Sequence, residues 1–324
     1  MNCSIAKLTD FIKSEALSLG FHACGISRAE SVEKDHSEFF ESWLEAGYNG
    51  NMAYFARNKE KRYNPTLLYK NCKSVISVAL NYFPNVKPDI KEAHMALFAY
   101  PTDYHIIVKE LLCSLLDSIK MRLSEEGIKV NGRAFCDSAP VAERFWAWKG
   151  GLGWIGKNHC LIIPGAGSFF VLGELLVDLE LASDTPVKGG CAECDACLKA
   201  CPTKALSKSI NDKGPLVFDS RLCLSYLTIE HKENLTAKQG IALKNCFYGC
   251  DICQEVCPHN REPKPTILKQ MMPNKRLLKL KNEQLKTLQA DSFNQLFKNS
   301  SVKRAGFTKI SDNIAWTTRF TDKE

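Results

Sequence analysis

Four cysteines in this chain form a run with the spacing of bacterial iron–sulfur proteins. Cys191, Cys194, Cys197 and Cys201 are followed at once by Pro202. Gaps of two, two and three residues with a trailing proline are typical of segments that bind 4Fe-4S clusters. A cubane needs four thiolates that converge on its corners, and a loop with short gaps can wrap three of them around one cube. The fourth thiolate then points toward a second cluster.

A second run supplies most of the ligands for that second cluster. It contains Cys250, Cys253 and Cys257 and also ends in proline. Nine of the 15 cysteines lie between residues 191 and 257, whereas two clusters need eight thiolates, so one thiol is spare. The spare is Cys223 or Cys246. Because Cys246 stands four residues before Cys250 and would make the second run irregular, the sequence favours Cys223 as the ligand.

The two predicted ligand sets combine cysteines from both runs. One cluster takes Cys191, Cys194, Cys197 and Cys257, and the other takes Cys201, Cys223, Cys250 and Cys253. Zinc ribbons also use Cys-x-x-Cys pairs, but zinc does not call for a proline-terminated run of four cysteines. A disulfide framework is disfavoured because nothing in the chain looks secreted.

Composition and charge are those of a mildly basic globular protein. Hydrophobic residues make up 45% and charged residues 24% of the 324 residues, and the net charge is +7. The start of the chain has neither the basic nor the apolar stretch of a secretory leader, and no apolar run approaches the ~20 residues that span a bilayer. We therefore expect a cytoplasmic protein with reduced thiols and no membrane partner.

Basic residues crowd the stretch after the cysteines. They are Lys264, Lys269, Lys275, Arg276, Lys279, Lys281, Lys286, Lys298, Lys303 and Arg304. Such a stretch permits a polyanionic partner, although charge alone fits a solvated helix face equally well.

Hydrophobic periodicity predicts interleaved helices and strands before the cysteines. Helices are expected over residues 5–19 and 104–124, and strands over 75–80, 129–135 and 169–176. The fold class is therefore α/β or α+β in residues 1–185. Two further parts follow, namely a two-cluster ferredoxin-like domain at 186–262 and a basic, mostly helical segment at 263–324.

A glycine-rich motif at residues 151–156, GLGWIG, fits GxGxxG. As a dinucleotide fingerprint it is weak, because a helix is expected before it and a loop leading to a strand after it, the reverse of what that fold needs. We interpret it instead as a loop that lets backbone approach a large flat ligand.

Two polar motifs are candidates for a site. CDSAP at residues 136–140 places Asp137 at the end of a predicted strand, where Asp137 or Ser138 could alternatively cap the next helix. DYH at residues 103–105 opens the long predicted helix, and its alternative role is also capping.

Together these segments resemble the epoxyqueuosine reductases, a family of cobalamin-dependent iron–sulfur enzymes. The matching segments are NMAYFARN at 51–58, Arg62, DYH at 103–105, CDSAP at 136–140, GLGWIGK at 151–157, CLSYLTIE at 223–230 and GCDICQ at 249–254. Many members continue into a C-terminal helical-repeat domain that helps to hold tRNA, whereas this chain ends after a short helix. The resemblance thus implies a short form that binds tRNA through residues 264–304 or binds it more weakly.

The resemblance also implies a fold and a set of site residues. The fold is α+β, with a nitroreductase-related cobalamin-binding domain and a bacterial two-cluster module. Asp137 would be the proton donor, with its pKa raised by an apolar, partly desolvated site. The residues around the corrin or the substrate would be Arg57, Asp103, Tyr104, His105, Ser138, Lys157 and Ser168. The resemblance supports Cys223 over Cys246 as a cluster ligand.

The implied reaction is the reduction of epoxyqueuosine to queuosine at the wobble position of tRNA, the last step of queuosine biosynthesis. Its cofactors are cobalamin and two 4Fe-4S clusters. Its partners are a tRNA anticodon loop and an external electron donor such as a flavodoxin or ferredoxin system, and we expect a monomer. The alternatives are a corrinoid reductase that acts on a small molecule, as reductive dehalogenases do, and a non-catalytic electron carrier.

Overall fold

The computed structural model describes residues 5–207 and 216–319. Within these, the chain divides into two compact units. The first consists of residues 1–45, 54–81 and 105–192, and the second of residues 46–53, 82–104 and 193–324, as far as each is described. The three-part division expected from the sequence, with boundaries after residues 185 and 262, stays a prediction.

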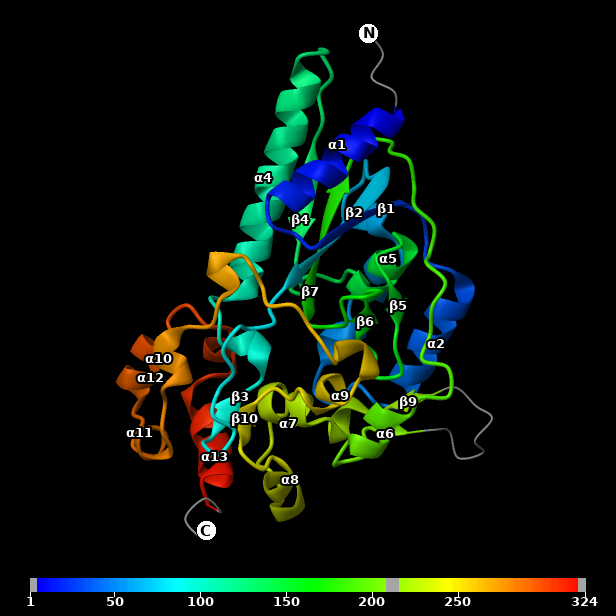
Figure 1. Cartoon of the computed structure of the whole chain (residues 1–324). Helices are drawn as coiled ribbons and strands as arrows, with labels where there is room; N and C mark the ends of the chain where they lie inside the picture. The colour runs from blue at the N-terminus through cyan, green and yellow to red at the C-terminus, as the bar shows by residue number, and fades with distance from the viewer. Residues whose placement is uncertain (1–4, 208–215, 320–324) are drawn as a thin grey trace. The chain divides into compact units, whose positions relative to one another are not determined.

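The first unit is built on a four-stranded antiparallel sheet (Figure 1). The strand order is β1 (Ala23–Arg28), β2 (Ser74–Asn81), β7 (Phe170–Val177) and β4 (Gly132–Phe135). β2 is buried over almost its whole length, because apolar residues stand on both of its faces. These strands confirm the expected strands at 75–80, 129–135 and 169–176, with boundaries shifted by a few residues.

One face of the sheet packs on the long helix α4 (Tyr104–Ser124) (Figure 1). The apolar side chains of α4 recur at helical spacing, and its bounds are those predicted from that pattern. A Cβ added at Gly173 of β7 would lie 2.4 Å from a methyl group of Val108, so the helix approaches the strand closely here. The odd-numbered residues of β7 therefore face α4.

The opposite face packs on the short helix α5 (Glu143–Lys149). Leu176 of β7 is buried in one apolar cluster with Phe145 and Trp146 of this helix. Because side chains alternate along a strand, Glu174 shares the face of Leu176 and points to the α5 side. An acidic side chain thus lies in the middle of a mostly apolar sheet face, beside Ser77 of β2.

The other elements of the first unit are shorter. The helices are α1 (Ile5–Ser18), α2 (Lys34–Glu45) and α3 (Lys59–Tyr63), and a small hairpin pairs β5 (Trp154–Ile155) with β6 (Leu161–Ile162). α1 confirms the helix expected over residues 5–19. None of the helices within 5–207 and 216–319 is long and apolar enough to cross a bilayer.

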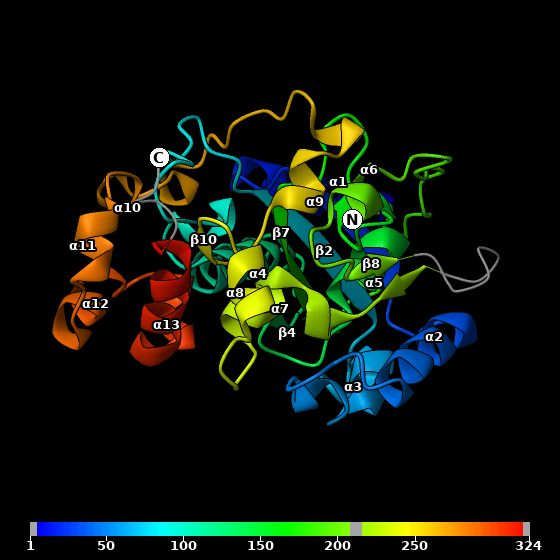
Figure 2. The ribbon, with the colours of Figure 1, turned by 90° about the horizontal axis from the view of Figure 1, so that it is seen from below.

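The second unit has small sheets and short helices. β3 (His94–Met95) pairs in parallel with β10 (Cys246–Tyr248), and β8 (Leu206–Ser207) pairs with β9 (Val217–Phe218). The helices are α6 (Ala196–Ala200), α7 (Leu224–Ile229), α8 (Ala237–Ala242), α9 (Ile252–Glu255), α10 (Lys275–Leu278), α11 (Asn282–Lys286), α12 (Ala290–Leu296) and α13 (Phe307–Thr317). Figures 1 and 2 show α13 beside α11 and α12, which it contacts.

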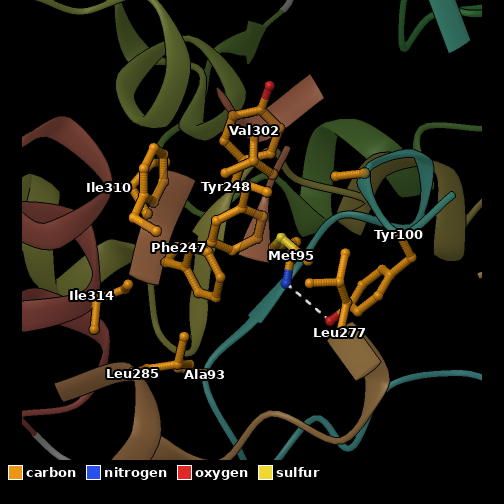
Figure 3. Packing of buried hydrophobic residues seen from close by; sticks show 13 residues of the cluster. Ala93, Met95, Tyr100, Phe247, Tyr248, Leu277, Leu285, Val302, Ile310 and Ile314 are labelled. Atoms are coloured by element: carbon orange, nitrogen blue, oxygen red, sulfur yellow. Dashed lines mark hydrogen bonds between the residues drawn. The ribbon is translucent and has the colours of Figure 1, made fainter. Parts of the chain in front are cut away.

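The core of the second unit joins segments that are far apart in the sequence (Figure 3). Phe247 and Tyr248 of β10 pack with Met95 of β3 and with Ile310 and Ile314 of α13. Figure 3 also shows the backbone N–H of Met95 donating to the hydroxyl of Tyr100, at 3.2 Å. Residues 82–104 therefore complete a core to which the C-terminal helices contribute.

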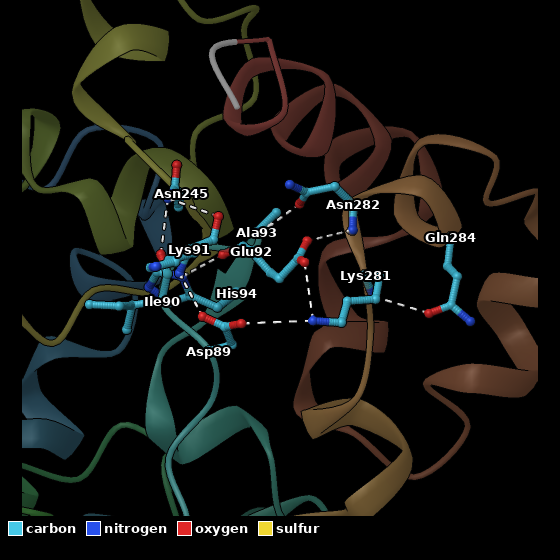
Figure 4. Close-up of polar contacts among 10 residues, drawn as sticks. All are labelled: Asp89, Ile90, Lys91, Glu92, Ala93, His94, Asn245, Lys281, Asn282 and Gln284. Carbon is cyan, nitrogen blue, oxygen red and sulfur yellow. Dashed lines mark hydrogen bonds and ion pairs between the residues drawn. The ribbon is translucent and has the colours of Figure 1, made fainter. Parts of the chain in front are cut away.

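A polar clamp holds this part of the second unit together (Figure 4). The Lys281 ammonium lies 3.1 Å from a Glu92 carboxylate oxygen and 3.7 Å from an Asp89 carboxylate oxygen. The other Glu92 oxygen accepts the Asn282 N–H at 2.9 Å, and the Asn282 side chain accepts the Ala93 N–H at 2.7 Å. We call these five residues the 89–282 clamp.

Candidate functional site

Asp137 lies in the loop between β4 and α5 and has an unusual backbone conformation. Its φ is +54°, in the left-handed region that L residues rarely adopt. Its backbone N–H donates to Oε1 of Glu143, the first residue of α5, at 2.5 Å. The Glu143 side chain, six residues along the chain, therefore accepts a hydrogen bond from the N–H of Asp137 in this conformation.

Two residues of α4 reach the same loop. Nε2 of His105 lies 3.1 Å from Oδ2 of Asp137, and Nζ of Lys109 donates to the Ser138 hydroxyl at 3.3 Å. His105 and Lys109 are one helical turn apart and share a face of α4. The structure thus brings together the predicted residues Asp137, His105 and Ser138. It adds Lys109, whose position four residues after His105 was the available signal.

The Asp137 carboxyl is accessible. Its side chain is 50% exposed and that of His105 is 21% exposed. The sequence predicts an apolar, partly desolvated site for this carboxyl. In the chain by itself the carboxyl is half exposed and hydrogen-bonded to an imidazole. Such a carboxyl can hold a proton and deliver it to a bound molecule, with the imidazole fixing its orientation.

The capping alternative for this loop is wrong. α5 begins at Glu143, its N-cap residue is Ala142, and no side chain caps it. Neither Asp137 nor Ser138 therefore satisfies the helix N-terminus. Their side chains are directed to α4 instead, as the contacts with His105 and Lys109 show.

Behind the loop lie two carboxyl groups that sequence reasoning missed, Glu174, which is fully buried, and Glu143, which is partly buried. Burial, together with the nearby Asp137 carboxyl, raises the pKa of Glu143 to about 8. Burial raises the pKa of Glu174 well above its usual range, and the contact with Glu143 adds to this effect. The signal in the sequence was a glutamate inside an apolar strand, FVLGELLV.

Arg62 supports the same loop from the other side. Its guanidinium lies over the rings of Phe40 and Phe55, with its central carbon 5.6 and 4.8 Å from the ring centroids. It donates to the backbone carbonyl of Val141 at 2.9 Å. Arg62 therefore anchors the residues that lead into α5 and lies near enough to Glu143 to interact with its charge.

The glycine-rich motif has an internal explanation. A Cβ at Gly153 would lie 2.1 Å from the carbonyl oxygen of Ile162, and one at Gly156 would lie 2.5 Å from the Ile162 side chain. Gly151 has a φ of +76°. Gly153 and Gly156 thus let β5 and β6 pack closely, whereas a Cβ at Gly151 would lie 2.7 Å from the Thr185 carbonyl oxygen. The expected approach of this loop to a flat ligand stays a prediction. No strand precedes the motif, which agrees with the rejection of a dinucleotide site.

The other predicted contact residues lie in different surroundings. Lys157 donates from its backbone to the Cys191 sulfur at 3.4 Å and from Nζ to the Ala192 carbonyl at 2.7 Å. Ser168 is buried and Arg57 is exposed, and both belong to the first unit. Asp103 and Tyr104 belong to the second unit, where the N–H of Asp103 donates to the Asn299 carbonyl at 2.8 Å.

Four cysteines of the second unit lie near one another. The thiol of Cys223 is close enough to Cys253 and Cys201 to feel their charges, and Cys250 likewise feels Cys223 and Cys253. Burial raises the pKa of Cys223 to about 11. Backbone N–H groups around Cys201 outweigh its burial and lower its pKa. These four cysteines are the predicted second ligand set.

The remaining ligands lie around two short helices. Cys197 is buried in α6 beside Leu198 and Leu206, Cys257 is buried at the end of the second run, and α6 packs on α9. Cys191 belongs to the first unit and Cys194 to the second. Among the described residues, no three His, Cys, Asp or Glu side chains are grouped as ligands of a single metal ion.

Cys246 behaves differently from the predicted ligands. Its buried sulfur donates to the carbonyl oxygens of Tyr248 at 3.6 Å and Gly249 at 3.4 Å. Burial raises its pKa, as it does for Cys223 and Cys250, and Cys246 lies close enough to Cys250 for their charges to interact, so the hydrogen bonds to backbone are what distinguish it. A thiol whose proton is engaged by backbone is a poor metal ligand, since metals bind the thiolate.

Comparison with protein families gives two matches. Residues 190–260 match the family described as "4Fe-4S double cluster binding domain". Residues 62–138 match "Epoxyqueuosine reductase QueG, DUF1730". The first match confirms the iron–sulfur prediction over zinc, and the second covers the segment from Arg62 to the Asp137 loop.

Curated proteins resemble the chain over nearly its full length. A protein of Leadbetterella byssophila is 40% identical over 94% of this chain and 96% of its own, and one of Cellulophaga algicola is 41% identical over 95% and 97%. An Escherichia coli protein is 35% identical over 95% of this chain and 80% of its own. All three are named epoxyqueuosine reductase.

Solved structures give the same similarity. An epoxyqueuosine reductase with a tRNA-Tyr epoxyqueuosine-modified tRNA stem loop has a TM-score of 0.85 and 25% identity, covering 97% of this chain and 81% of that one. An epoxyqueuosine reductase from Streptococcus thermophilus has a TM-score of 0.81 and 27% identity, covering 95% and 80%.

Proposed function

This chain belongs to the epoxyqueuosine reductase family, and we propose that it reduces epoxyqueuosine to queuosine at the wobble position of tRNA. The observation that carries the proposal is the Asp137–His105 pair, placed at the accessible end of the sheet in a chain that resembles these reductases almost throughout. The conversion of the epoxide to an alkene takes two electrons and two protons and releases the oxygen as water.

Asp137 is the proposed proton donor in this reaction. Its half-exposed carboxyl can reach a bound molecule, and the His105 hydrogen bond orients it. A positioned general acid is required because the departing epoxide oxygen must be protonated as its bond to carbon breaks. Lys109 and Ser138 continue the polar surface beside it.

The polar groups around the Asp137 loop fit a corrin, whose rim carries amide side chains that need hydrogen-bond donors and acceptors. The proposed holding residues are Arg57, Asp103, Tyr104, His105, Ser138, Lys157 and Ser168, on a fold related to the nitroreductases. Cobalamin, when bound, supplies a reduced cobalt that serves as nucleophile and reductant. The chain's residues would bind its periphery, orient the substrate and supply the proton.

The 4Fe-4S double cluster domain supplies the electrons one at a time from an external carrier of the flavodoxin or ferredoxin class. The proposed ligands are Cys191, Cys194, Cys197 and Cys257 for one cluster and Cys201, Cys223, Cys250 and Cys253 for the other. The proximity of the last four thiols and the engaged proton of Cys246 support this division. We also propose that the enzyme is a cytoplasmic monomer.

The proposed macromolecular partner is a tRNA anticodon loop, bound through the exposed basic residues at 264–304. Such binding weakens steeply with salt. The modified base must leave the loop stack to reach the site, as expected for recognition of splayed loop bases.

Anaerobic turnover tests the proposal. Protein with reconstituted clusters, cobalamin and a strong reductant is given epoxyqueuosine-containing tRNA, and the nucleosides are measured by mass spectrometry. We expect the loss of one oxygen, dependent on cobalamin. No conversion by protein with intact clusters and bound cobalamin would overturn the proposed substrate.

A further inference from the structure

We propose that Glu143 and the fully buried Glu174 form a proton-sharing pair that positions Asp137 through its backbone N–H. Both are positioning residues, because they act on the reaction through Asp137. This inference rests on the proposed function for its catalytic meaning, while the pair itself is a feature of the folded chain.

The sheet places Glu174 where it can reach only the α5 side. It stands in the middle of β7, paired with Ser77 of β2 on one side and Phe135 of β4 on the other. Glu174 and Ser77 are both 0% exposed. Glu143, the first residue of α5, meets Glu174 from above this face.

Packing alone does not account for Glu174. Neither of its carboxyl oxygens has a hydrogen bond of normal geometry among the described residues, and the Ser77 hydroxyl has none either. A buried polar group without a partner destabilises a fold by ~1–3 kcal/mol, and an apolar side chain of similar size would fit this face better. Exceptions of this kind concentrate at functional sites.

The pair holds at least one proton at neutral pH. Two carboxyls in contact cannot both ionise without a large penalty, so their titration belongs to the pair. The charged groups that act on Glu143 are Asp137, Arg62 and His105, besides Glu174 itself. Burial raises the pKa of both carboxyls, that of Glu143 to about 8, so the pair carries a proton at pH 7.

A proton on Glu174 gives a chain of hydrogen bonds that ends at the catalytic loop. Protonated Glu174 can donate to Glu143, and Glu143 accepts the N–H of Asp137 at 2.5 Å. The second bond holds Asp137 at its positive φ, the conformation in which its side chain meets His105.

The first test compares two replacements of Glu143 that differ in one property. Glu143→Gln keeps an oxygen that accepts the Asp137 N–H, whereas Glu143→Leu keeps the approximate size and loses the acceptor. We expect kcat to fall about 10- to 100-fold in Glu143→Leu, the effect of one lost charge-assisted hydrogen bond, with KM for tRNA unchanged. Glu143→Gln should retain most of kcat but lose the inflection near pH 8. Equal kcat in wild type and Glu143→Leu would overturn the positioning role.

Two readouts do not depend on turnover. Hydrogen–deuterium exchange of the peptide that carries Asp137 should accelerate in Glu143→Leu and stay slow in Glu143→Gln. The infrared carbonyl band of protonated carboxyls shielded from water should be present in wild type at pH 7 and weaker in Glu174→Gln, in which Glu143 still holds a proton. A wild-type protein without this band overturns the pair, whereas a protein with the band and with protected Asp137 that fails to reduce epoxyqueuosine overturns only the proposed function.

Discussion

The Glu143–Glu174 pair and the 89–282 clamp both contain carboxyl groups, but the surroundings of these groups are opposite in kind. In the clamp, Glu92 is engaged by Lys281 and by the N–H of Asn282, close to solvent. In the pair, Glu174 is fully buried and faces another acid. Polar groups with complementary partners within the chain need no further explanation. Polar groups with unused hydrogen-bonding capacity indicate a site of binding or catalysis.

Replacing Asp137 should have the largest effect, because the Glu143–Glu174 pair acts on the reaction through this residue. Asp137→Asn keeps the shape of the loop and removes the acid, so kcat should fall about 100- to 10,000-fold. Mass spectrometry of the tRNA nucleosides measures this, with the cluster absorbance as the control for an intact protein. Turnover close to wild type would remove Asp137 from the mechanism.

Cysteines provide the same contrast in another side chain. Cys223 lies among other thiols, whereas the proton of Cys246 is engaged by two backbone carbonyls. Cys223→Ser should therefore lose one cluster and about half of the bound iron, and Cys246→Ser should keep both clusters. Iron and sulfide analysis after anaerobic reconstitution measures the difference. Equal iron in the two variants would contradict the ligand assignment.

The Glu143–Glu174 pair also predicts how stability depends on pH. Because the pKa of Glu143 is raised from 4.5 to about 8, the folded chain binds more protons than the unfolded chain between these values. The free energy of unfolding contributed by Glu143 therefore decreases as pH rises through this window and levels off above it. Glu174→Gln removes one acid. The thermal midpoint of this variant, relative to that of wild type, should therefore increase as pH rises from 5 to 8. Parallel curves would show that the two carboxyls do not interact.

The smallest expected effects concern two lysines, one outside the clamp and one within it. Lys279 is exposed and has no ion pair among the described residues, whereas Lys281 is held by the clamp. Lys279→Gln should weaken tRNA binding, lowering the salt slope by about 0.7 to 0.9 if it contacts one phosphate, and leave the thermal midpoint unchanged. Lys281→Gln should lower the midpoint slightly and change the salt slope less. The reverse pattern would assign the RNA contact to the clamp.

Sequence reasoning succeeded where the signal was local. The bounds of α4 followed from the spacing of its apolar residues, and the iron–sulfur assignment followed from the cysteine runs. It missed Glu143, Glu174 and Lys109 because their roles depend on contacts between separate elements. Glu174 becomes informative only once strand pairing and the approach of α5 place it opposite another acid.

The neighbours of the glycine motif could not be predicted for a related reason. A run of glycines indicates close approach of backbone, but it does not tell which group approaches. In this chain the neighbour of Gly153 is the carbonyl of Ile162, on the partner strand of the hairpin. Packing between β5 and β6 accounts for Gly153 and Gly156.

The cluster-bearing unit of this chain is not a portable cassette. Its core includes Met95, and its segment at 46–53 comes so close that a Cβ on Gly50 would lie 2.4 Å from the hydroxyl of Tyr226. Grafting residues 186–262 onto another protein would leave both partners behind. Recombination between relatives would therefore have to exchange residues 46–53 and 82–104 together with the cysteines, which ties the inheritance of the electron-transfer module to that of the catalytic half.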